Sequence, residues 1–331
     1  MTSVLKSNKK RLLYLIAWTV ASVCIYLAVR KLQWDSVLAE LKNASFFWLS
    51  LALVGNFCIL IFGTLQWLNF LPRNYHVGFP RMIEINALMA MTSNTVPFFA
   101  GHALAVVLLA KREKVGHAVA LSVIALDQFA EGFAKLSLFL LVVILTPIPD
   151  WMRQGILIAL SAILLLFAVL IFFAFRHRHF KVFMGRQSHP RWYKVWHFIS
   201  RWAHHLEALR SVRIFAVGMG TALAMKGAEV FAIWAIQKSL GVGLPLWTIF
   251  LVLASVSLVT MVPVSPGNLG IYEAAVFLVY QYLGLPPEQA LGLALLQHLC
   301  SLISNIGTGY FILLYRNFYP ARPHQAREEI S

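Results

Sequence analysis

Apolar runs long enough to cross a bilayer recur along the chain, and they restrict its fold more than any other feature. About 20 apolar residues in a helix span the hydrocarbon core of a membrane. The predicted spans are Leu12–Val29, Phe46–Phe70, Val119–Leu145, Ile156–Phe175, Ile214–Ile236 and Ala290–Tyr315. Of all residues, 60% are hydrophobic and only 12% are charged, whereas about a quarter of a soluble domain is charged. We therefore expect an all-α polytopic membrane protein with these six transmembrane helices.

Two further apolar segments are interrupted where a spanning helix would be expected to continue. Met82–Ala110 is broken at Asn94–Pro97 and again at Gly101, and Leu246–Leu283 is broken by Pro263–Glu273. Proline removes a backbone donor and glycine relaxes the chain, so a straight helix cannot run through either break. In a membrane, the freed backbone groups are tolerated only where they are buried in protein or line a wet cavity. We predict that each segment forms a re-entrant helical hairpin, which enters and leaves on the same side.

Charge and repetition both favour this topology. It places most of the 28 Lys and Arg residues, and both termini, on the cytoplasmic side, as the positive-inside rule requires. The order span, hairpin, span then occurs twice, in units of about 46–145 and 214–315, with the two hairpins entering from opposite sides. Opposed repeats with paired broken helices are typical of transporters that bind their substrate at the repeat interface. The alternative is coincidence, because short Pro and Gly matches are common in membrane helices.

The predicted domain organisation is simple. Residues 1–318 form one membrane domain, and residues 319–331 form a cytoplasmic tail. We expect the first span to remain as a helix rather than be cleaved as a signal peptide, because no small-residue cleavage site follows it before Arg30. The basic, Trp-rich segment 176–213 has an apolar stripe at helical spacing, which predicts a helix on the cytoplasmic membrane surface.

Two motifs carry a family resemblance. The run Pro-x-Ser-Pro-Gly-x-Leu-Gly-x-x-Glu at 263–273 resembles the signature of a flippase-like integral membrane family, which is related to the transmembrane part of lysylphosphatidylglycerol synthase. Asn94-x-x-Pro97-x-x-x-Gly101 is similar to that family's first signature, and Asp127 fits its acidic position. The resemblance implies lipid transport in a bacterial or archaeal cytoplasmic membrane. No soluble aminoacyl-transfer domain is found in the sequence, so synthase activity is not implied.

Hydropathy places four acids inside the membrane: Asp127, Glu131, Glu229 and Glu273. A charge at the bilayer centre costs about 2.5–3.5 kcal/mol or more, so such residues are candidates for function. Spacings of four and three residues predict a Glu131–Lys135 pair and a Lys226–Glu229 pair. Either pair could be purely structural. Asp127 is the candidate for proton coupling, because its neighbour at helical spacing is the like-charged Glu131.

The candidate substrate-binding residues flank the two breaks or lie on the last span. They are Asn94, Pro97, Gly101, His102, Ser265, Pro266, Gly267, Asn268, Gly270, Glu273 and His298. Helices that begin at the breaks would aim backbone amides at the bilayer middle, a setting suited to a lipid phosphate. Gln297 and Asn305 are expected to face the same cavity. Two bland alternatives stay open: Glu273 as a helix cap, and His298 as a satisfied interior residue.

The functional hypothesis is a transporter that moves an anionic phospholipid or a lipid-linked sugar between leaflets, with proton coupling through the intramembrane acids. The alternatives are a membrane-embedded enzyme acting on a lipid-linked substrate, and an accessory subunit of a lipid-modifying enzyme or glycosyltransferase. The sequence contains no nucleotide loop, nucleophile elbow or zinc-protease motif. We expect no enzyme activity, cofactor, metal or nucleic-acid partner. The oligomeric state stays open.

Overall fold

The computed structural model describes residues 34–96, 100–184, 211–261 and 265–318, and within these ranges every regular element is a helix. In chain order the elements are α2 (Trp34–Lys42), α3 (Phe46–Phe70), α4 (Phe79–Thr95), α5 (Ala100–Lys111), α6 (His117–Leu145), α7 (Asp150–Met184), α9 (Val212–Ser239), α10 (Trp247–Val259), η2 (Pro266–Asn268), α11 (Ile271–Tyr282), α12 (Pro287–Leu302), η3 (Ile303–Gly307) and α13 (Thr308–Phe318). The predicted all-α class is confirmed.

Five helical stretches in the described ranges are long and apolar enough to cross a membrane. They are Phe46–Phe70, His117–Leu145, Asp150–Phe172, Val212–Ser239 and Pro287–Phe318. Each corresponds to one predicted span, so the protein is a multi-pass membrane protein. The predicted span Leu12–Val29 lies outside the described residues, as does 185–210 of the predicted surface helix. The preceding helix α7 continues as far as Met184, into that basic segment.

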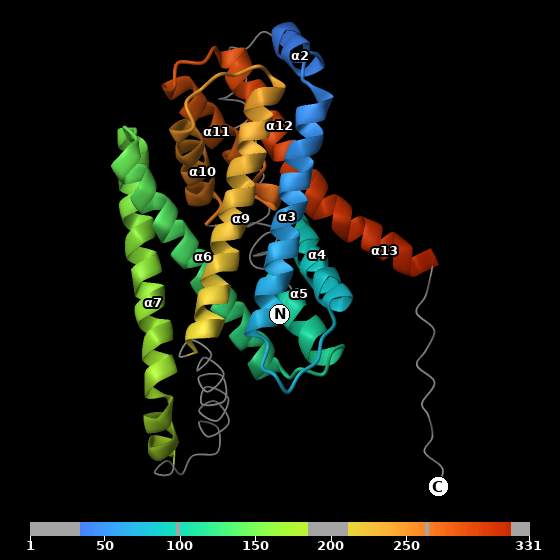
Figure 1. Cartoon of the computed structure of the whole chain (residues 1–331), viewed down its shortest axis with the longest axis vertical. Helices are drawn as coiled ribbons and strands as arrows, with labels where there is room; N and C mark the ends of the chain where they lie inside the picture. Colours follow the sequence, from blue (N-terminus) through green and yellow to red (C-terminus); the bar gives the residue numbers. More distant parts are fainter. Residues whose placement is uncertain (1–33, 97–99, 185–210, 262–264, 319–331) are drawn as a thin grey trace, which may run out of the picture.

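Helices α3 and α9 run side by side along the long axis of the molecule, while α6 crosses the bundle obliquely and α7 lies at its edge (Figure 1). Small residues allow α3 and α9 to approach closely. A methyl group added at Gly55 of α3 would lie only 3.1 Å from the Phe231 ring of α9. The contact also contains a buried hydrogen bond, in which Gln66 Nε2 donates to the Gly218 carbonyl at 2.9 Å. This pair forms a wall against which the shorter helices pack.

The two broken segments occupy opposite ends of the bundle. Helices α4 and α5 pack against each other in the lower half of Figure 1, and α10 and α11 lie in the upper half. Gly101 of α5 sits against Ser93 and the Met89 carbonyl of α4, with no room for a side chain. The carbonyl of Asn94, at the end of α4, lies 3.1 Å from where a Cβ at Gly267 of η2 would be. The ends of the two broken segments therefore meet inside the protein.

The apolar core is divided in the same way. One cluster of buried side chains, including Trp67, Met82 and Leu109, surrounds α4 and α5. The other, including Ile249 and Tyr280, surrounds α10 and α11. Each half of the core therefore holds one broken segment, and the boundary between the halves is where polar groups gather.

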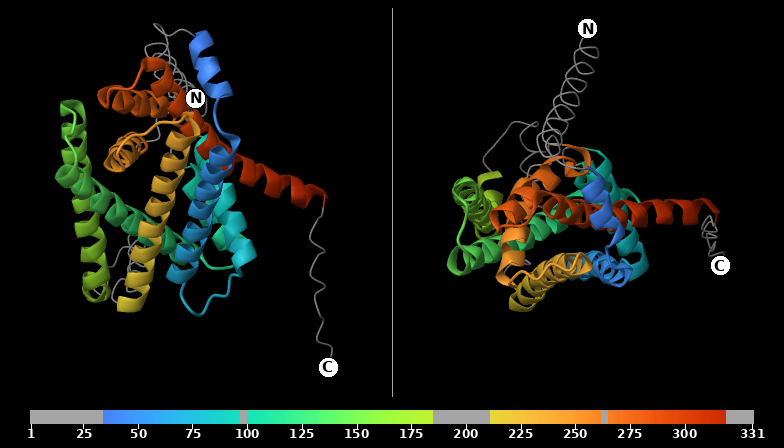
Figure 2. Two further views of the ribbon diagram at one scale, coloured as in Figure 1. Left: turned by 45° about the horizontal axis from the view of Figure 1, so that its top comes forward. Right: turned by 90° about the horizontal axis from the view of Figure 1, so that it is seen from above.

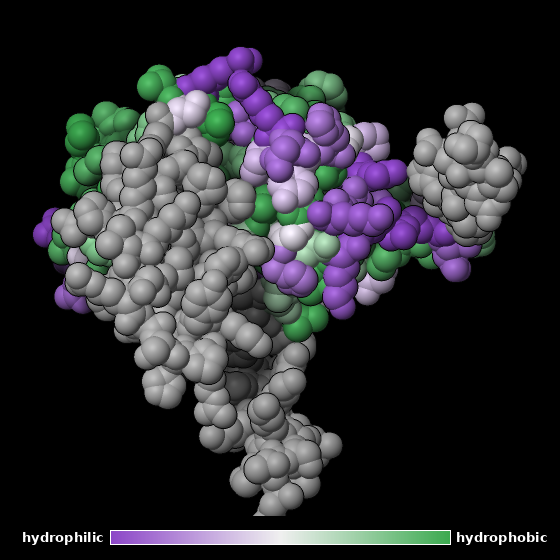
Figure 3. Space-filling view, turned by 90° about the horizontal axis from the view of Figure 1, so that it is seen from below, coloured by the Kyte–Doolittle hydropathy of each residue, from purple (hydrophilic) through white to green (hydrophobic). Residues whose placement is uncertain are grey.

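Hydrophilic side chains gather at the lower end of the molecule (Figure 3). Glu84 of α4 accepts hydrogen bonds from Arg112 at 2.7 and 3.1 Å and from Arg316 of α13 at 2.8 Å. Helix α13 otherwise projects away from the bundle (Figure 2). The two arginines thus connect α4 both to the end of α5 and to the projecting helix.

Candidate functional site

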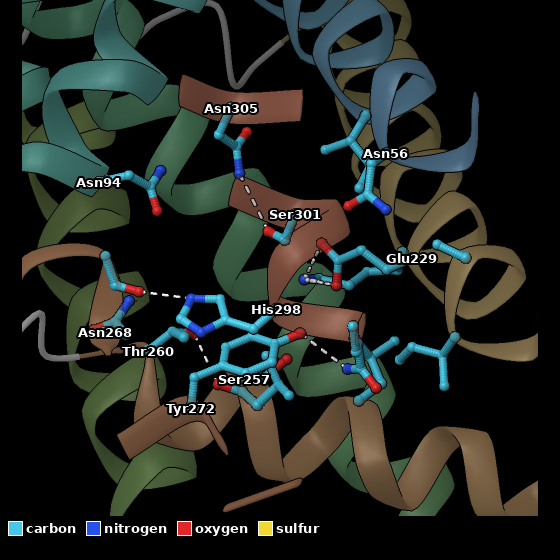
Figure 4. Close-up of a pocket in the computed structure, with 18 of the residues that line it drawn as sticks. Asn56, Asn94, Glu229, Ser257, Thr260, Asn268, Tyr272, His298, Ser301 and Asn305 are labelled. Carbon is cyan, nitrogen blue, oxygen red and sulfur yellow. Dashed lines mark hydrogen bonds and ion pairs between the residues drawn. The ribbon is translucent and has the colours of Figure 1, made fainter. Parts of the chain in front are cut away.

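Two adjoining chambers lie between the halves of the core. The first has a volume of about 240 Å³ and receives residues from both broken segments. Its polar wall consists of Asn56, Asn94, Glu131, Lys135, Lys226, Glu229, Ser257, Thr260, Asn268, Tyr272, Gln297, His298, Ser301 and Asn305. Figure 4 shows His298 and Tyr272 between Asn268 on one side and Glu229 on the other. A polar cavity of this kind inside a 60% hydrophobic chain is the outstanding feature of the structure.

The second chamber has a volume of about 270 Å³ and a more apolar wall. The polar residues that it shares with the first chamber are Glu131, Lys226, Glu229 and Asn305. The polar residues that it adds are Trp67, Asn86, Ser93, His102 and Asp127. Because charged residues line both chambers, we refer to the two adjoining chambers together as the polar path.

His298 of α12 joins η2 to the first turn of α11 within the second break. Its Nε2 lies 2.8 Å from the carbonyl oxygen of Gly267, and its Nδ1 lies 2.8 Å from Oε1 of Glu273. Oε2 of Glu273 accepts a hydrogen bond of 2.7 Å from the Gly270 amide, which caps α11. The ring of Tyr272 stacks on His298 with centroids 4.2 Å apart. Glu273 is therefore both a helix cap and the partner of His298.

The hydrogen bonds of this unit fix the number of protons that it holds. A backbone carbonyl can only accept, so Nε2 of His298 carries a hydrogen toward Gly267. A second hydrogen must lie between Nδ1 and Oε1 of Glu273, on either atom, to make the 2.8 Å contact. The pair thus holds one shared proton and has no net charge. The Gly270 amide, which the sequence suggested as a contact for a bound anion, is already used by Glu273.

The ion pairs that the spacing predicts are both present. Lys135 Nζ lies 2.7 Å from Glu131 on α6, and Lys226 Nζ lies 2.8 Å from both carboxylate oxygens of Glu229 on α9. Each cation therefore has an anion on its own helix. As a result, the four charges that face the first chamber balance, which lowers the cost of placing them in the protein interior.

Asp127 has partners that the sequence did not indicate. Its Oδ1 accepts a 2.9 Å hydrogen bond from the indole nitrogen of Trp67 on α3. Its Oδ2 lies 3.3 Å from the side-chain amide of Gln128, which also lies 3.4 Å from both His102 and Glu131. The acid that fits the family motif is thus connected through Gln128 to the shared wall of the chambers.

The structure brings together many, but not all, of the predicted site residues. Those in the chamber walls are Asn94, His102, Asp127, Glu131, Lys135, Lys226, Glu229, Gly267, Asn268 and His298. The described candidates outside both walls are Gly101, Ser265, Pro266, Gly270 and Glu273. Of these, Ser265 donates to the Leu269 carbonyl at 2.9 Å and shapes the break, and Glu273 acts through His298. Pro97 lies outside the described residues.

Several wall residues were not singled out from the sequence: Asn56, Ser257, Thr260 and Ser301. One signal could have found Ser301, because Gln297, Ser301 and Asn305 recur at intervals of four residues, and such positions share a helix face. The last of them lies in η3, a π-helical turn. Such turns appear frequently at functional sites, and this one places Asn305 against both chambers.

Among the described residues, no three His, Cys, Asp or Glu side chains are grouped so that they could hold a metal ion. The family model described as lysylphosphatidylglycerol synthase TM region matches the chain over residues 14–309. No curated protein matches the chain. The match covers nearly the whole sequence and confirms the resemblance carried by the two motifs.

Proposed function

Since the protein belongs to the lysylphosphatidylglycerol synthase transmembrane family, we propose that it moves a lipid between the leaflets of the membrane. The observation that carries this proposal is the polar path formed by the two chambers, to which both broken segments contribute. A headgroup can pass through such a path while its acyl chains stay in the hydrocarbon. The proposed cargo is an anionic phospholipid or a lipid-linked sugar.

The proposed topology has α4–α5 and α10–α11 as re-entrant hairpins that enter from opposite sides. Their lengths support this. The longest of the four helices, α4, has 17 residues, or roughly 26 Å of helix, which is shorter than the ~30 Å hydrocarbon core. The packing of each pair and the meeting of Asn94 with Gly267 also fit two hairpins whose tips touch at the middle. The two units would then form an inverted repeat around the chambers.

In the proposed mechanism, the headgroup enters the chambers and the repeats alternate around it. A change in the protonation of Asp127, of Glu131 or of the Glu273–His298 pair changes the charge of the path, and so favours one orientation over the other. The balanced Glu131–Lys135 pair supports this role, because neutralising its acid leaves an uncompensated lysine facing the cargo.

Neutralising these acids tests the function. Asp127→Asn, Glu131→Gln and Glu273→Gln are each expected to reduce lipid exchange between the leaflets of proteoliposomes by ~10-fold or more, equivalent to 1.4 kcal/mol. Glu288→Gln, an acid in the first turn of α12 outside both chambers, should exchange lipid normally. Unchanged exchange in all three of Asp127→Asn, Glu131→Gln and Glu273→Gln would contradict the mechanism. Recovery of chemically altered lipid would identify an enzyme instead.

Cysteine labelling tests the topology. In a protein whose native cysteines have been replaced, Lys111→Cys and Lys114→Cys at the end of α5 should react with a membrane-impermeant maleimide only from the cytoplasmic side. Lys238→Cys, at the end of α9, should react only from outside, and it serves as the matched control. Labelling of the Lys111 position from outside would refute the first hairpin, because α4–α5 would then cross the membrane.

A further inference from the structure

Two side-chain amide oxygens in the wall of the first chamber have no hydrogen-bond donor among the residues that the structure describes. Gln297 of α12 is only 5% exposed, and its Nε2 donates to the Tyr272 hydroxyl at 2.9 Å. Its Oε1 is buried and accepts no hydrogen bond from any described residue. Oδ1 of Asn268 in η2 is also buried and without a donor in the described part of the chain. Both residues line the first chamber, so two different elements place an amide with an unused acceptor in its wall.

Such groups are informative because burial of a polar atom without a partner costs free energy. Asn268 also has a left-handed backbone, with φ of 56°, a conformation that side-chain-bearing residues rarely adopt. A chamber of about 240 Å³ has room for several hydroxyl groups, since a water occupies roughly 30 Å³.

The charges that face the chamber restrict which chemical groups of a lipid headgroup can bind there. Lys135 and Lys226 are already paired with carboxylates at 2.7 and 2.8 Å. A phosphate brings only acceptors when ionised, and would leave Gln297 Oε1 and Asn268 Oδ1 unsatisfied. An ammonium group could donate to them but would add a positive charge to a chamber whose four charges already balance. A hydroxyl donates without adding charge, and it can also accept from Ser257, Thr260 or Ser301.

We propose that the first chamber recognises the uncharged hydroxyl groups of a lipid headgroup, of the glycerol or sugar type, through Gln297 Oε1 and Asn268 Oδ1. The inference rests on the proposed function for the assignment of the guest as a lipid. It adds that selectivity comes from hydroxyl donors at this subsite rather than from the phosphate. The Gln297 amide is held by Tyr272, which itself stacks on His298, so the acceptor is fixed by the same unit that closes the second break.

Four lipids with identical acyl chains separate hydroxyl recognition from phosphate recognition. Binding to the purified protein is measured by native mass spectrometry for a glucosyl diacylglycerol, a diacylglycerol, phosphatidylglycerol and phosphatidate. Glucosyl diacylglycerol should bind about tenfold more tightly than diacylglycerol, and phosphatidylglycerol about tenfold more tightly than phosphatidate, as expected for satisfying a buried acceptor. A preference for only one hydroxylated lipid identifies the source, sugar or glycerol. Equal binding within both pairs would overturn the proposal.

Two variants test whether the preference for hydroxylated headgroups arises at Gln297 and Asn268. Gln297→Met keeps the length of the side chain and removes its acceptor, so the hydroxyl preference should fall to within about twofold. Gln66→Met is the matched control, because Gln66 is also a buried glutamine whose Oε1 has no donor among the described residues, but it lies outside both chambers. Asn268→Gly retains the left-handed backbone and gives a second, independent removal of an acceptor.

The outcomes separate this inference from the proposed function. An unchanged preference in folded Gln297→Met and Asn268→Gly, or an equal loss in Gln66→Met, would overturn the subsite. If Gln297→Met fails to elute as a single species, Asn268→Gly decides alone. Hydroxyl preference without lipid exchange in proteoliposomes would retain the subsite and overturn transport. Exchange without the preference would retain transport and overturn the subsite.

Discussion

Glu273→Gln should leave the protein folded while exchange is lost, whereas His298→Ala should lower the free energy of unfolding by about 3–5 kcal/mol. Glutamine can accept the Gly270 amide with its carbonyl and donate to Nδ1 of a neutral His298 with its amide. The histidine then keeps its contact with Gly267, so all three hydrogen bonds of the unit survive. The substitution removes only the proton that Glu273 and His298 share.

His298→Ala, in contrast, breaks the two hydrogen bonds that the histidine makes in this unit. It leaves the Glu273 carboxylate, whose side chain is 12% exposed, without its partner and removes the donor from the Gly267 carbonyl. Denaturant unfolding in detergent micelles, monitored by tryptophan fluorescence, measures both variants. The double variant Glu273→Gln with His298→Ala should recover part of the lost stability, because the unpaired charge is gone. If Glu273→Gln destabilises the fold as much as His298→Ala, the shared proton is not what connects these residues.

Gly101→Ala is expected to be the most damaging of the small substitutions, with a loss of about 3 kcal/mol, at the upper end of the usual cost of overpacking. An added Cβ would collide with Ser93 and with the Met89 carbonyl, and a backbone atom in a packed helix cannot move aside cheaply. We expect α4 and α5 to separate, and exchange to fall with stability, because α4 contributes Asn94 to the first chamber.

The matched control for this substitution is Gly220→Ala in α9. Apart from its chain neighbours and the nearby backbone of α9 itself, no described residue comes within 4 Å of a Cβ at Gly220, and alanine is the better helix former by about 1 kcal/mol. This variant should therefore be as stable as the native protein or slightly more so. The same unfolding measurement compares the two. Equal stability of Gly101→Ala and Gly220→Ala would contradict the tight α4–α5 contact.

Much of the fold could be predicted because membrane spans depend on local hydropathy. The second span was placed at Phe46–Phe70, its observed bounds. The start of α7 was missed, because the helix begins at Asp150, before the apolar run. An acid there interacts favourably with the helix dipole. Polar residues in the first turn therefore extend the helix beyond what hydropathy alone indicates.

In the site, the contacts within one helix could be predicted, but the contacts between helices could not. The Glu131–Lys135 and Lys226–Glu229 pairs could be predicted because each lies on one helix. The contacts of Glu273 with His298 and of Asp127 with Trp67 join residues 25 and 60 positions apart. No spacing rule connects such residues, because their approach depends on how separate helices pack. The sequence therefore indicated most of the participants but not their partners.

The π-helical turn at Ile303–Gly307 affects how the last span should be drawn on a helical wheel. Each residue of an α-helix turns the chain by about 100°, and a π turn accommodates more residues than an α turn. Pro287–Leu302 and Thr308–Phe318 consequently follow two different phases, although they form one continuous helix. A single wheel for the whole span would assign one half to the wrong face. Cysteine-scanning data on this helix should be plotted on two wheels, one on either side of Asn305.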